Sequence, residues 1–399
     1  MFNISSWGFI IKFSTSLASS SLIIISILLL KSNFEMVEMK CKICGESRPY
    51  ISKVFGICKE CILEGGEAIK HVRKIHGEIR KKFNLPPEPP KDGNVKCNIC
   101  SNKCRMKENE VGYCGLRMNI RGKLRSLVSD EEALLYTYLD PIPTNCCAAW
   151  FCPGCTGRGY PKYAYKNGPE YGFYNLASFF YGCNFDCVYC QNISHKNLWK
   201  APKMTIEKFV NEVKNEKITC ICYFGGSPEP QLPFAIKASK EALKLGKKIL
   251  RICWEWNGCG NEKLVKRAAK IAGESGGIIK FDLKCFDENL SIALSGVSNK
   301  QAYKNFKMIG EKFFDRYDIP VLTATTLLVP GYVDKDEVRK ISKFIAEIND
   351  EIPYQLLVFH PDYMMMDLPI TPRKQVYECF NEAKKYLKNV DIGNIHLIT

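Results

Sequence analysis

The stretch YNLASFFYGCNFDCVYCQN, residues 174 to 192, joins a run of strand-forming residues to three closely spaced cysteines. The first half, YNLASFFYG, is β-rich and ends at a glycine. Cys183, Cys187 and Cys190 follow in C-x3-C-x2-C spacing. An ordinary structural zinc site or iron–sulfur cluster takes four protein ligands, so three thiolates leave a metal site one ligand short. This stretch therefore predicts a strand that leads directly into an incomplete metal site.

The pattern of a short β-rich run followed by a helical stretch recurs from residue 172 onward. The six runs are YNLASFFYG, ITCICYF, KILRICWEW, GIIKFDL, VLTATTLLV and YQLLVF. Helical stretches such as TIEKFVNEVKNE, PFAIKASKEALKL, EKLVKRAAKIA and DEVRKISKFIAEI lie between them. This alternation is typical of parallel βα units. Six such units predict an α/β fold, a partial (β/α)6 barrel over residues 172–399.

Polar residues and glycines recur where the expected strands end. In barrels of this kind the chemistry collects at the C-terminal ends of the strands. The cysteines follow the first strand, and the residues at the other five strand ends are Gly225, Gly226, Glu255, Asn257, Asp282, Lys284, Pro330, Gly331 and His360. A random scatter of turn glycines and surface charges would not follow the strand ends in this way. We therefore expect one site at a shared rim.

Residues 36–66 contain two C-x-x-C pairs, Cys41 with Cys44 and Cys58 with Cys61, with 13 residues between the pairs. Paired cysteine knuckles at such a separation can close a tetrahedral zinc site. We expect a zinc-ribbon-like module there.

Residues 67–95 predict a basic helix and a proline-rich linker. NLPPEPPKDG, at 84 to 93, breaks the helix because consecutive prolines remove hydrogen-bond donors and fix an extended backbone. His71 and His76 lie on the helix, and we expect both to be solvated rather than metal ligands.

Residues 96–171 predict a cysteine-rich accessory region with two groups of four thiols. The first group supplies enough ligands for one zinc ion or a second cluster, and its members are Cys97, Cys100, Cys104 and Cys114. The second group fits an auxiliary cluster, a zinc ion, a redox pair or unligated thiols, and its members are Cys146, Cys147, Cys152 and Cys155.

Residues 1–35 contain an uncharged segment, FSTSLASSSLIIISILLL at 13 to 30, which is just long enough to span a bilayer. It predicts either a weak N-terminal membrane anchor or an upstream extension from a misplaced start codon. Either interpretation leaves the catalytic body in the cytoplasm, where 21 cysteines favour metal ligation over disulfides. The formal net charge of +15 could indicate binding to nucleic acid. The lysines are dispersed along helical faces, which does not favour this interpretation.

Several of these stretches resemble a known family. GCNFDCVYC resembles the three-cysteine signature of radical S-adenosylmethionine (SAM) enzymes, with Tyr189 at the aromatic position, and YFGGSPEP resembles the glycine motif of that superfamily. FDLK, LVPGYVD and LVFHP are similar to stretches of glycyl-radical-enzyme activases related to the pyruvate formate-lyase activating enzyme. The resemblance covers roughly residues 172 to 365. GYCGLR and its preceding cysteines resemble, less specifically, the front of archaeal activase-like proteins.

The resemblance implies a 4Fe-4S cluster on Cys183, Cys187 and Cys190, whose open iron binds SAM. It also implies reductive cleavage of SAM to a 5′-deoxyadenosyl radical, with the electron coming from a ferredoxin- or flavodoxin-type donor. Residues that match SAM contacts of the family are Gly225, Gly226, Glu255, Asn257, Asp282, Lys284 and His360. The glycine motif departs from the activase form because Ser227 and Pro228 intervene before Glu229.

The substrate is left open by the sequence. One hypothesis is an activase that acts on a protein, and another is modification of RNA, or of another protein, presented by the basic accessory region. A third hypothesis is a non-catalytic metal-binding adaptor, against which the three intact cysteines argue.

Overall fold

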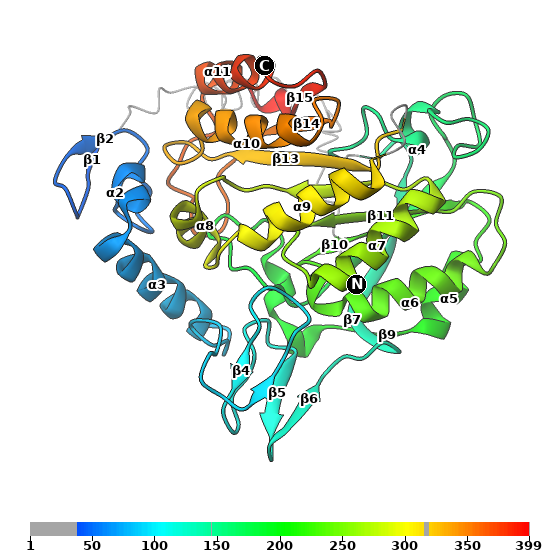
Figure 1. The fold of residues 1–399 in the computed structure, drawn as a ribbon, viewed down its shortest axis with the longest axis horizontal. Coiled ribbons are helices and arrows are strands. Elements are labelled where there is room, and N and C mark those ends of the chain that lie inside the picture. The colour runs from blue at the N-terminus through cyan, green and yellow to red at the C-terminus, as the bar shows by residue number, and fades with distance from the viewer. Residues whose placement is uncertain (1–37, 145, 315–318, 399) are drawn as a thin grey trace, which may run out of the picture. The chain divides into compact units, whose positions relative to one another are not determined.

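A nine-stranded sheet forms the centre of the computed structural model, which describes residues 38–144, 146–314 and 319–398 (Figure 1). The expected membrane anchor or extension at residues 1–35 lies outside the described residues. In the part of the chain that is described, no helix combines the length and apolar composition needed to cross a bilayer.

The sheet carries its strands in the order β15, β14, β13, β12, β11, β10, β8, β7, β9. Its parallel strands are β8 (Tyr174–Phe180), β10 (Ile218–Gly225), β11 (Arg251–Trp256), β12 (Ile279–Asp282), β13 (Leu322–Leu328), β14 (Tyr354–Val358) and β15 (Val390–Gly393). All six runs expected from the sequence form strands. Two antiparallel strands extend one edge, and they are β7 (Glu132–Pro141) and β9 (Lys203–Thr205).

A continuous layer of helices covers one face of this sheet (Figure 1). The helices that alternate with the parallel strands are α5 (Ile206–Val213), α6 (Leu232–Leu243), α7 (Glu262–Ser275), α8 (Glu288–Ser295), α9 (Lys300–Phe313), α10 (Lys335–Ile348) and α11 (Arg373–Ala383). Parallel strands that follow chain order and connect by right-handed crossovers place all their helices on the same face. The other face of the sheet is therefore free of these helices.

The alternation of side chains along β11 separates the two faces. Trp254 points toward the helices, where its indole Nε1 donates a hydrogen bond to the carbonyl oxygen of Ala268 in α7 at 3.0 Å. Glu255, its neighbour in the chain, points to the opposite face because successive strand residues alternate. The helix-covered face is thus apolar and packed, whereas the opposite face carries charged groups.

The cysteine-rich region upstream of the sheet is built from short elements. These are β1 (Met39–Lys40), β2 (Ser47–Arg48), α2 (Lys59–Glu64), α3 (Gly66–Lys81), β3 (Val95–Lys96), β4 (Arg105–Met106), β5 (Arg117–Ile120) and β6 (Lys123–Ser126). Both α2 and α3 pack against α8. Because Glu38–Thr399 forms one compact unit, the domain boundaries expected after residues 66, 95 and 171 remain predictions.

The structure contradicts the expectation that His76 is solvated. His76 is only 2% exposed, and its ring nitrogens contact Asp186 Oδ2 and the carbonyl oxygen of Ala293, both at 2.8 Å. Val72, His76 and Ile79 share one stripe of α3, so the histidine occupies a buried helical position that aliphatic periodicity alone did not reveal. His71 is half-buried, with Nε2 2.9 Å from the carbonyl oxygen of Phe55.

A buried ion pair fastens the segment before β8 to the open face of the sheet. Both guanidinium nitrogens of Arg251 contact the Glu170 carboxylate, at 2.8 and 2.7 Å, and the Thr219 hydroxyl lies 2.8 Å from Arg251 Nη2. Burial opposes the charge of Glu170, but the hydrogen bonds from Arg251 hold the pKa of that carboxyl below its usual range. The pair is fully removed from water, so each charge depends on the other.

Glu170→Ala should lower the free energy of unfolding by about 3–5 kcal/mol, because it leaves Arg251 buried without its counter-charge. The contribution of Glu170 should be present above its unfolded pKa and disappear as the pH falls through its lower folded pKa. Urea denaturation under anaerobic conditions measures both effects. Lys237→Ala, which removes an exposed pair with Glu131, is the control and should change stability little. Equal losses in both variants would contradict this account.

Candidate functional site

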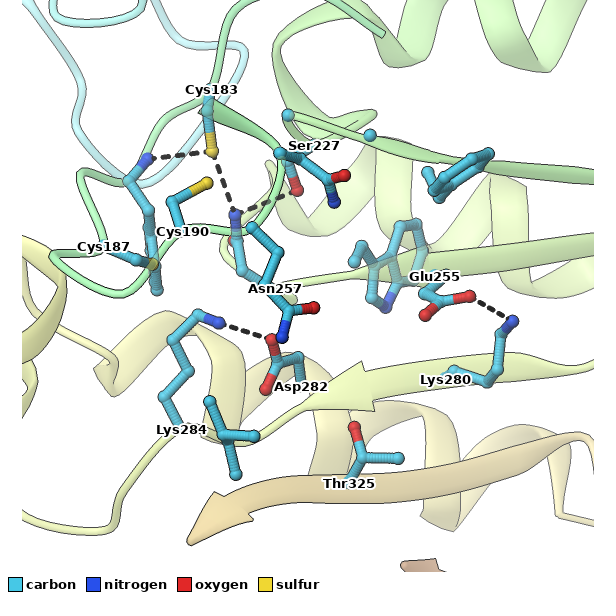
Figure 2. Close-up of a pocket in the computed structure, with 18 of the residues that line it drawn as sticks. Cys183, Cys187, Cys190, Ser227, Glu255, Asn257, Lys280, Asp282, Lys284 and Thr325 are labelled. Atoms are coloured by element: carbon cyan, nitrogen blue, oxygen red, sulfur yellow. Dashed lines mark hydrogen bonds and ion pairs between the residues drawn. The ribbon is translucent and has the colours of Figure 1, made fainter. Parts of the chain in front are cut away.

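A cavity of about 230 Å³ opens at the C-terminal ends of β8, β10, β11, β12 and β13 (Figure 2). It lies where the sequence analysis expects a shared rim, although Pro330, Gly331 and His360 of the expected set do not line it. Residues of its wall from the expected set are Cys183, Cys187, Cys190, Gly225, Gly226, Glu255, Asn257, Asp282 and Lys284. Parallel strands bring these residues together because their carboxyl ends meet at one edge of the sheet.

The three cysteines surround one end of this cavity on the loop after β8. The backbone N–H of Phe185 donates to Cys183 Sγ at 3.3 Å, and Cys187 Sγ lies 3.5 Å from Ser295 Oγ. Burial raises the pKa of Cys183 well above its ordinary value and that of Cys190 to about 12. Such thiols lose their protons when a metal cation binds them.

Asp186 holds the cysteine loop in place from within. Its carboxylate is 1% exposed and meets the His76 ring at 2.8 Å and two cationic side chains, Arg80 at 3.4 Å and Lys196. Burial opposes the charge of Asp186, but the hydrogen bond from His76 and the charges of Lys196 and Arg80 hold its pKa well below the usual range. The sequence analysis did not identify this group, since two of its partners, His76 and Arg80, lie about 110 residues upstream.

The two glycines after β10 are needed because the chain approaches itself closely. A Cβ on Gly225, where φ is +112°, would lie 2.6 Å from the backbone nitrogen of Phe180. A Cβ on Gly226 would lie 2.6 Å from the carbonyl oxygen of Gly182 and 2.8 Å from the His195 ring. Both glycines line the cavity, but the space that a side chain would need is already filled by β8 and the cysteine loop.

Asn257 and Ser227 connect the cysteine loop to β11. Asn257 Nδ2 donates to Asn184 Oδ1 at 2.9 Å and to Ser227 Oγ at 3.0 Å, and it lies 4.0 Å from Cys183 Sγ (Figure 2). Ser227 was noted in the sequence only as a departure from the glycine motif, yet it lines the cavity. Its position directly after two glycines at a strand end is the sequence signal that could have identified it as a cavity residue.

Glu229 lies behind the cavity wall rather than in it. Its carboxylate accepts a hydrogen bond from the Gly258 N–H at 2.7 Å and one from the Ser227 hydroxyl. Complete burial raises the pKa of Glu229 from 4.5 to about 7, against the hydrogen bonds from Ser227 and Gly258. Glu229 therefore positions the turn that carries Asn257.

Two ion pairs line the cavity floor, Asp282 with Lys284 and Glu255 with Lys280 (Figure 2). Lys284 Nζ also lies 5.5 Å from the centre of the Tyr189 ring. Asp282 and Glu255 are partly exposed to the cavity, whereas Lys280 is buried. The floor thus offers carboxylate acceptors held in place by two lysines.

His360 does not line the cavity itself but contacts a residue that does. Its Nε2 lies 2.9 Å from Gln191 Nε2, and Gln191 lines the cavity. Three further polar atoms in the cavity wall are buried with no hydrogen-bond partner among the described residues, namely Tyr189 OH, His195 Nδ1 and Trp256 Nε1. Unsatisfied polar atoms of this kind indicate a place for a polar ligand.

The thiols of Cys41, Cys44, Cys58 and Cys61 lie within 4.8 Å of one another. The separation between Cys41 Sγ and Cys61 Sγ is 3.8 Å, and between Cys44 Sγ and Cys58 Sγ it is 3.9 Å. Tetrahedral zinc with bonds of about 2.3 Å places its sulfurs about 3.8 Å apart. These thiols therefore have the spacing of a four-coordinate zinc site.

The other two cysteine groups lie elsewhere. Cys97, Cys100, Cys104 and Cys114 line a second, smaller cavity. Of the later group, Cys147 lines the main cavity with Sγ 3.7 Å from Glu255 Oε1, and Cys146 Sγ lies 3.0 Å from Lys280 Nζ. Cys152 precedes α4 (Pro153–Thr156), and its Sγ accepts from the N–H of Cys155 at 3.4 Å.

The family model and the similar proteins found for this chain agree with one another. Residues 177–345 match the model of the radical SAM superfamily. The pyruvate formate-lyase-activating enzyme of Staphylococcus aureus is 30% identical over 192 residues, which are 45% of this chain and 72% of that enzyme. A putative glycyl-radical enzyme activating enzyme of Methanocaldococcus jannaschii is 29% identical over 215 residues, 53% of this chain and 77% of that protein. An uncharacterized protein of the same organism is 27% identical over 322 residues, 76% of this chain and 82% of its own length.

An α/β sheet with a polar cavity at the carboxyl ends of its parallel strands is the arrangement of an enzyme. This chain belongs to the radical SAM superfamily and is a radical SAM enzyme. Membership implies an iron–sulfur cluster and SAM, and it confirms the resemblance first seen in residues 182 to 192.

Glu229→Gln should change how stability depends on pH. The unfolded carboxyl ionises near 4.5 while the folded one stays protonated to about 7, so the native protein loses stability as the pH rises between these values. The variant cannot ionise, and relative to it the native chain should lose roughly 3 kcal/mol between pH 4.5 and 7. Denaturation of both proteins at pH 4.5, 6 and 7.5 measures the difference. A difference that stays constant with pH would refute the assignment.

Proposed function

We propose that Cys183, Cys187 and Cys190 hold a 4Fe-4S cluster and that this enzyme cleaves SAM reductively in the cavity beside it. The observation that carries the proposal is the placement of the three thiols of one loop, Cys183, Cys187 and Cys190, around one end of a polar cavity. The sheet beneath is expected to curve into the partial (β/α)6 barrel typical of this superfamily.

The residues of the cavity fit such a cofactor and ligand. Three thiols, one buried and two half-buried, leave one metal position for an outside ligand. The unpartnered atoms of Tyr189, His195 and Trp256 suit a polar molecule. When bound and reduced, the cluster supplies the electron that breaks a carbon–sulfur bond of SAM and yields a 5′-deoxyadenosyl radical.

The protein groups bind and orient SAM. The backbone at Gly225 and Gly226 faces the place for the amino end, and Asn257 and Glu255 lie where ribose-side and cation contacts are expected. Asp282 is held by Lys284 and offers an acceptor, while His360 acts from the rim through Gln191. The cavity walls exclude water from a reactive radical.

The substrate that we propose is a protein, as for an activase. The relatives named as activating enzymes support this choice. We propose a ferredoxin- or flavodoxin-type protein as electron donor and the cytoplasm as location.

We propose that Cys41, Cys44, Cys58 and Cys61 bind zinc. The spacing of their sulfurs supports one tetrahedral ion. The module contacts the catalytic part of the chain through Lys59, which lies 2.7 Å from Asp334, and through Ser52, whose hydroxyl lies 3.0 Å from Asp367. Its role is therefore structural, at a distance from the cavity.

Cys187→Ala should abolish the release of 5′-deoxyadenosine and methionine from SAM by reduced protein, because two thiolates do not retain the cluster in place. Asp282→Ala should keep the cluster and raise the KM for SAM roughly 10- to 100-fold, as expected for one lost hydrogen bond to a charged group. Chromatography of the products measures both. Cys379→Ala and Asp350→Ala, at sites away from the cavity, are the matched controls and should cleave normally. Cleavage by Cys187→Ala would refute the site.

The double variant Cys41→Ala, Cys44→Ala should lose about one zinc ion per chain, since two thiolates cannot close a tetrahedral site. The SAM-sensitive signal of the cluster should remain, because the zinc ligands lie outside the cavity. Metal analysis by mass spectrometry and electron paramagnetic resonance provide the two measurements. Loss of the cluster signal in this variant would show that the two sites are not independent.

A further inference from the structure

The four thiols of Cys97, Cys100, Cys104 and Cys114 surround a small cavity of about 10 Å³. The first three are buried, at 8%, 8% and 6% exposure, and the fourth is half-buried. The N–H of Tyr113 donates to Cys104 Sγ at 3.4 Å, as backbone donors do toward metal-bound thiolates. Below, these four residues are called the upstream quartet.

The sulfurs of the upstream quartet are spaced more widely than a single zinc ion allows. Among the described residues, only the set at Cys41, Cys44, Cys58 and Cys61 brings three or more ligand atoms within 4.8 Å of one another. Neither the upstream quartet nor the triad at Cys183, Cys187 and Cys190 meets that spacing. The quartet therefore resembles the triad of this chain, which we assign to a cluster, and not its zinc-like set.

A buried cation with one unpaired nitrogen lines the same cavity. Arg117 is 7% exposed, lines the cavity, and its Nη1 has no hydrogen-bond partner among the described residues. Leaving a buried guanidinium nitrogen unpaired is costly, so a negative group is expected beside it. A 4Fe-4S cluster with four thiolates carries net negative charge, which Arg117 would balance.

The quartet lies next to the catalytic cysteine loop. Cys114 and Cys183 line one small cavity between them. The backbone at Gly182 comes so near that a Cβ there would be 3.2 Å from the carbonyl oxygen of Cys114. Asn102, inside the quartet loop, donates through Nδ2 to the carbonyl oxygen of Asn184 at 2.8 Å. Two clusters in these positions would be close enough for direct electron transfer.

We infer that the upstream quartet holds a second, fully thiolate-ligated 4Fe-4S cluster that relays electrons to the catalytic cluster. One electron from a ferredoxin- or flavodoxin-type donor reduces the second cluster, which is oxidised again when it reduces the catalytic cluster, and no atom or proton moves. The metal assignment stands by itself, whereas the relay role rests on the proposed function.

Two full-length variants, purified anaerobically, test the metal assignment. The triple variant Cys183→Ala, Cys187→Ala, Cys190→Ala should retain about four iron and four sulfide per chain, and these should disappear when Cys100→Ser and Cys104→Ser are added. Zinc in place of this iron in the triple variant overturns the inference. This count does not require SAM cleavage, so it decides the quartet even if the proposed function fails.

Arg117→Gln gives a second test that keeps all four thiols. Removing the positive charge disfavours the reduced, more negative cluster, so its midpoint potential should become more negative in an electrochemical titration. Arg125→Gln makes the same change of charge on the exposed strand β6 of the same hairpin and serves as control. An unchanged potential in Arg117→Gln would overturn the placement of the cluster beside Arg117.

The relay role is tested by exchanging the electron source. Cys100→Ser with Cys104→Ser should cleave SAM at nearly the normal rate with dithionite, which reduces the catalytic cluster directly. With reduced flavodoxin the rate should fall about tenfold or more, because the path through the quartet is lost. Equal rates with both reductants would overturn the relay. Loss of dithionite-driven cleavage would overturn it as well, because the quartet would then be required by the catalytic site itself.

Discussion

The buried carboxylate of Asp186 is the constraint on which the site depends. In the chain Asp186 lies between Cys183 and Cys187. Its carboxylate contacts His76 and Arg80 from α3 and Lys196 from the segment after the cysteine loop. Taking these charges out of water is costly, and the cost is offset only when all partners are in place. The loop can therefore reach its buried geometry only in a chain whose upstream helix is docked, which makes α3 a structural part of the catalytic unit.

The two faces of the sheet have different roles: one packs against the helices, and the other carries charged groups and the cavity. On one face Trp254 and the helical layer form an apolar core, while on the other Arg251, Glu255 and Lys280 are held by ion pairs. Of these three, Glu255 and Lys280 line the cavity. Charged groups on the open face are tolerated because each has a partner at hydrogen-bond distance. A cavity with fixed dipoles can orient a charged ligand with little rearrangement.

The described thiols of this chain fall into groups that differ in spacing rather than in residue type. The set at residues 41–61 is compact enough for one ion, whereas the catalytic triad and the upstream quartet surround open space. A cube of iron and sulfide needs that space, and zinc does not. The metals that we propose for these groups differ because the backbone separates the sulfurs by different distances.

The sequence by itself determined six of the seven parallel strands, the helices between them and the cysteine triad, because hydrophobic periodicity and ligand spacing are local properties. It did not reveal β15. It also placed Asn257 and Asp282 at a common rim, since strand ends meet at one edge. Only the tertiary structure decided that His76 is buried against Asp186 and that Arg117 faces the quartet. It also decided that Gly225 and Gly226 are required by β8 and the cysteine loop. These are contacts between segments far apart in the chain, and the free energy that fixes them arises only when both segments are folded.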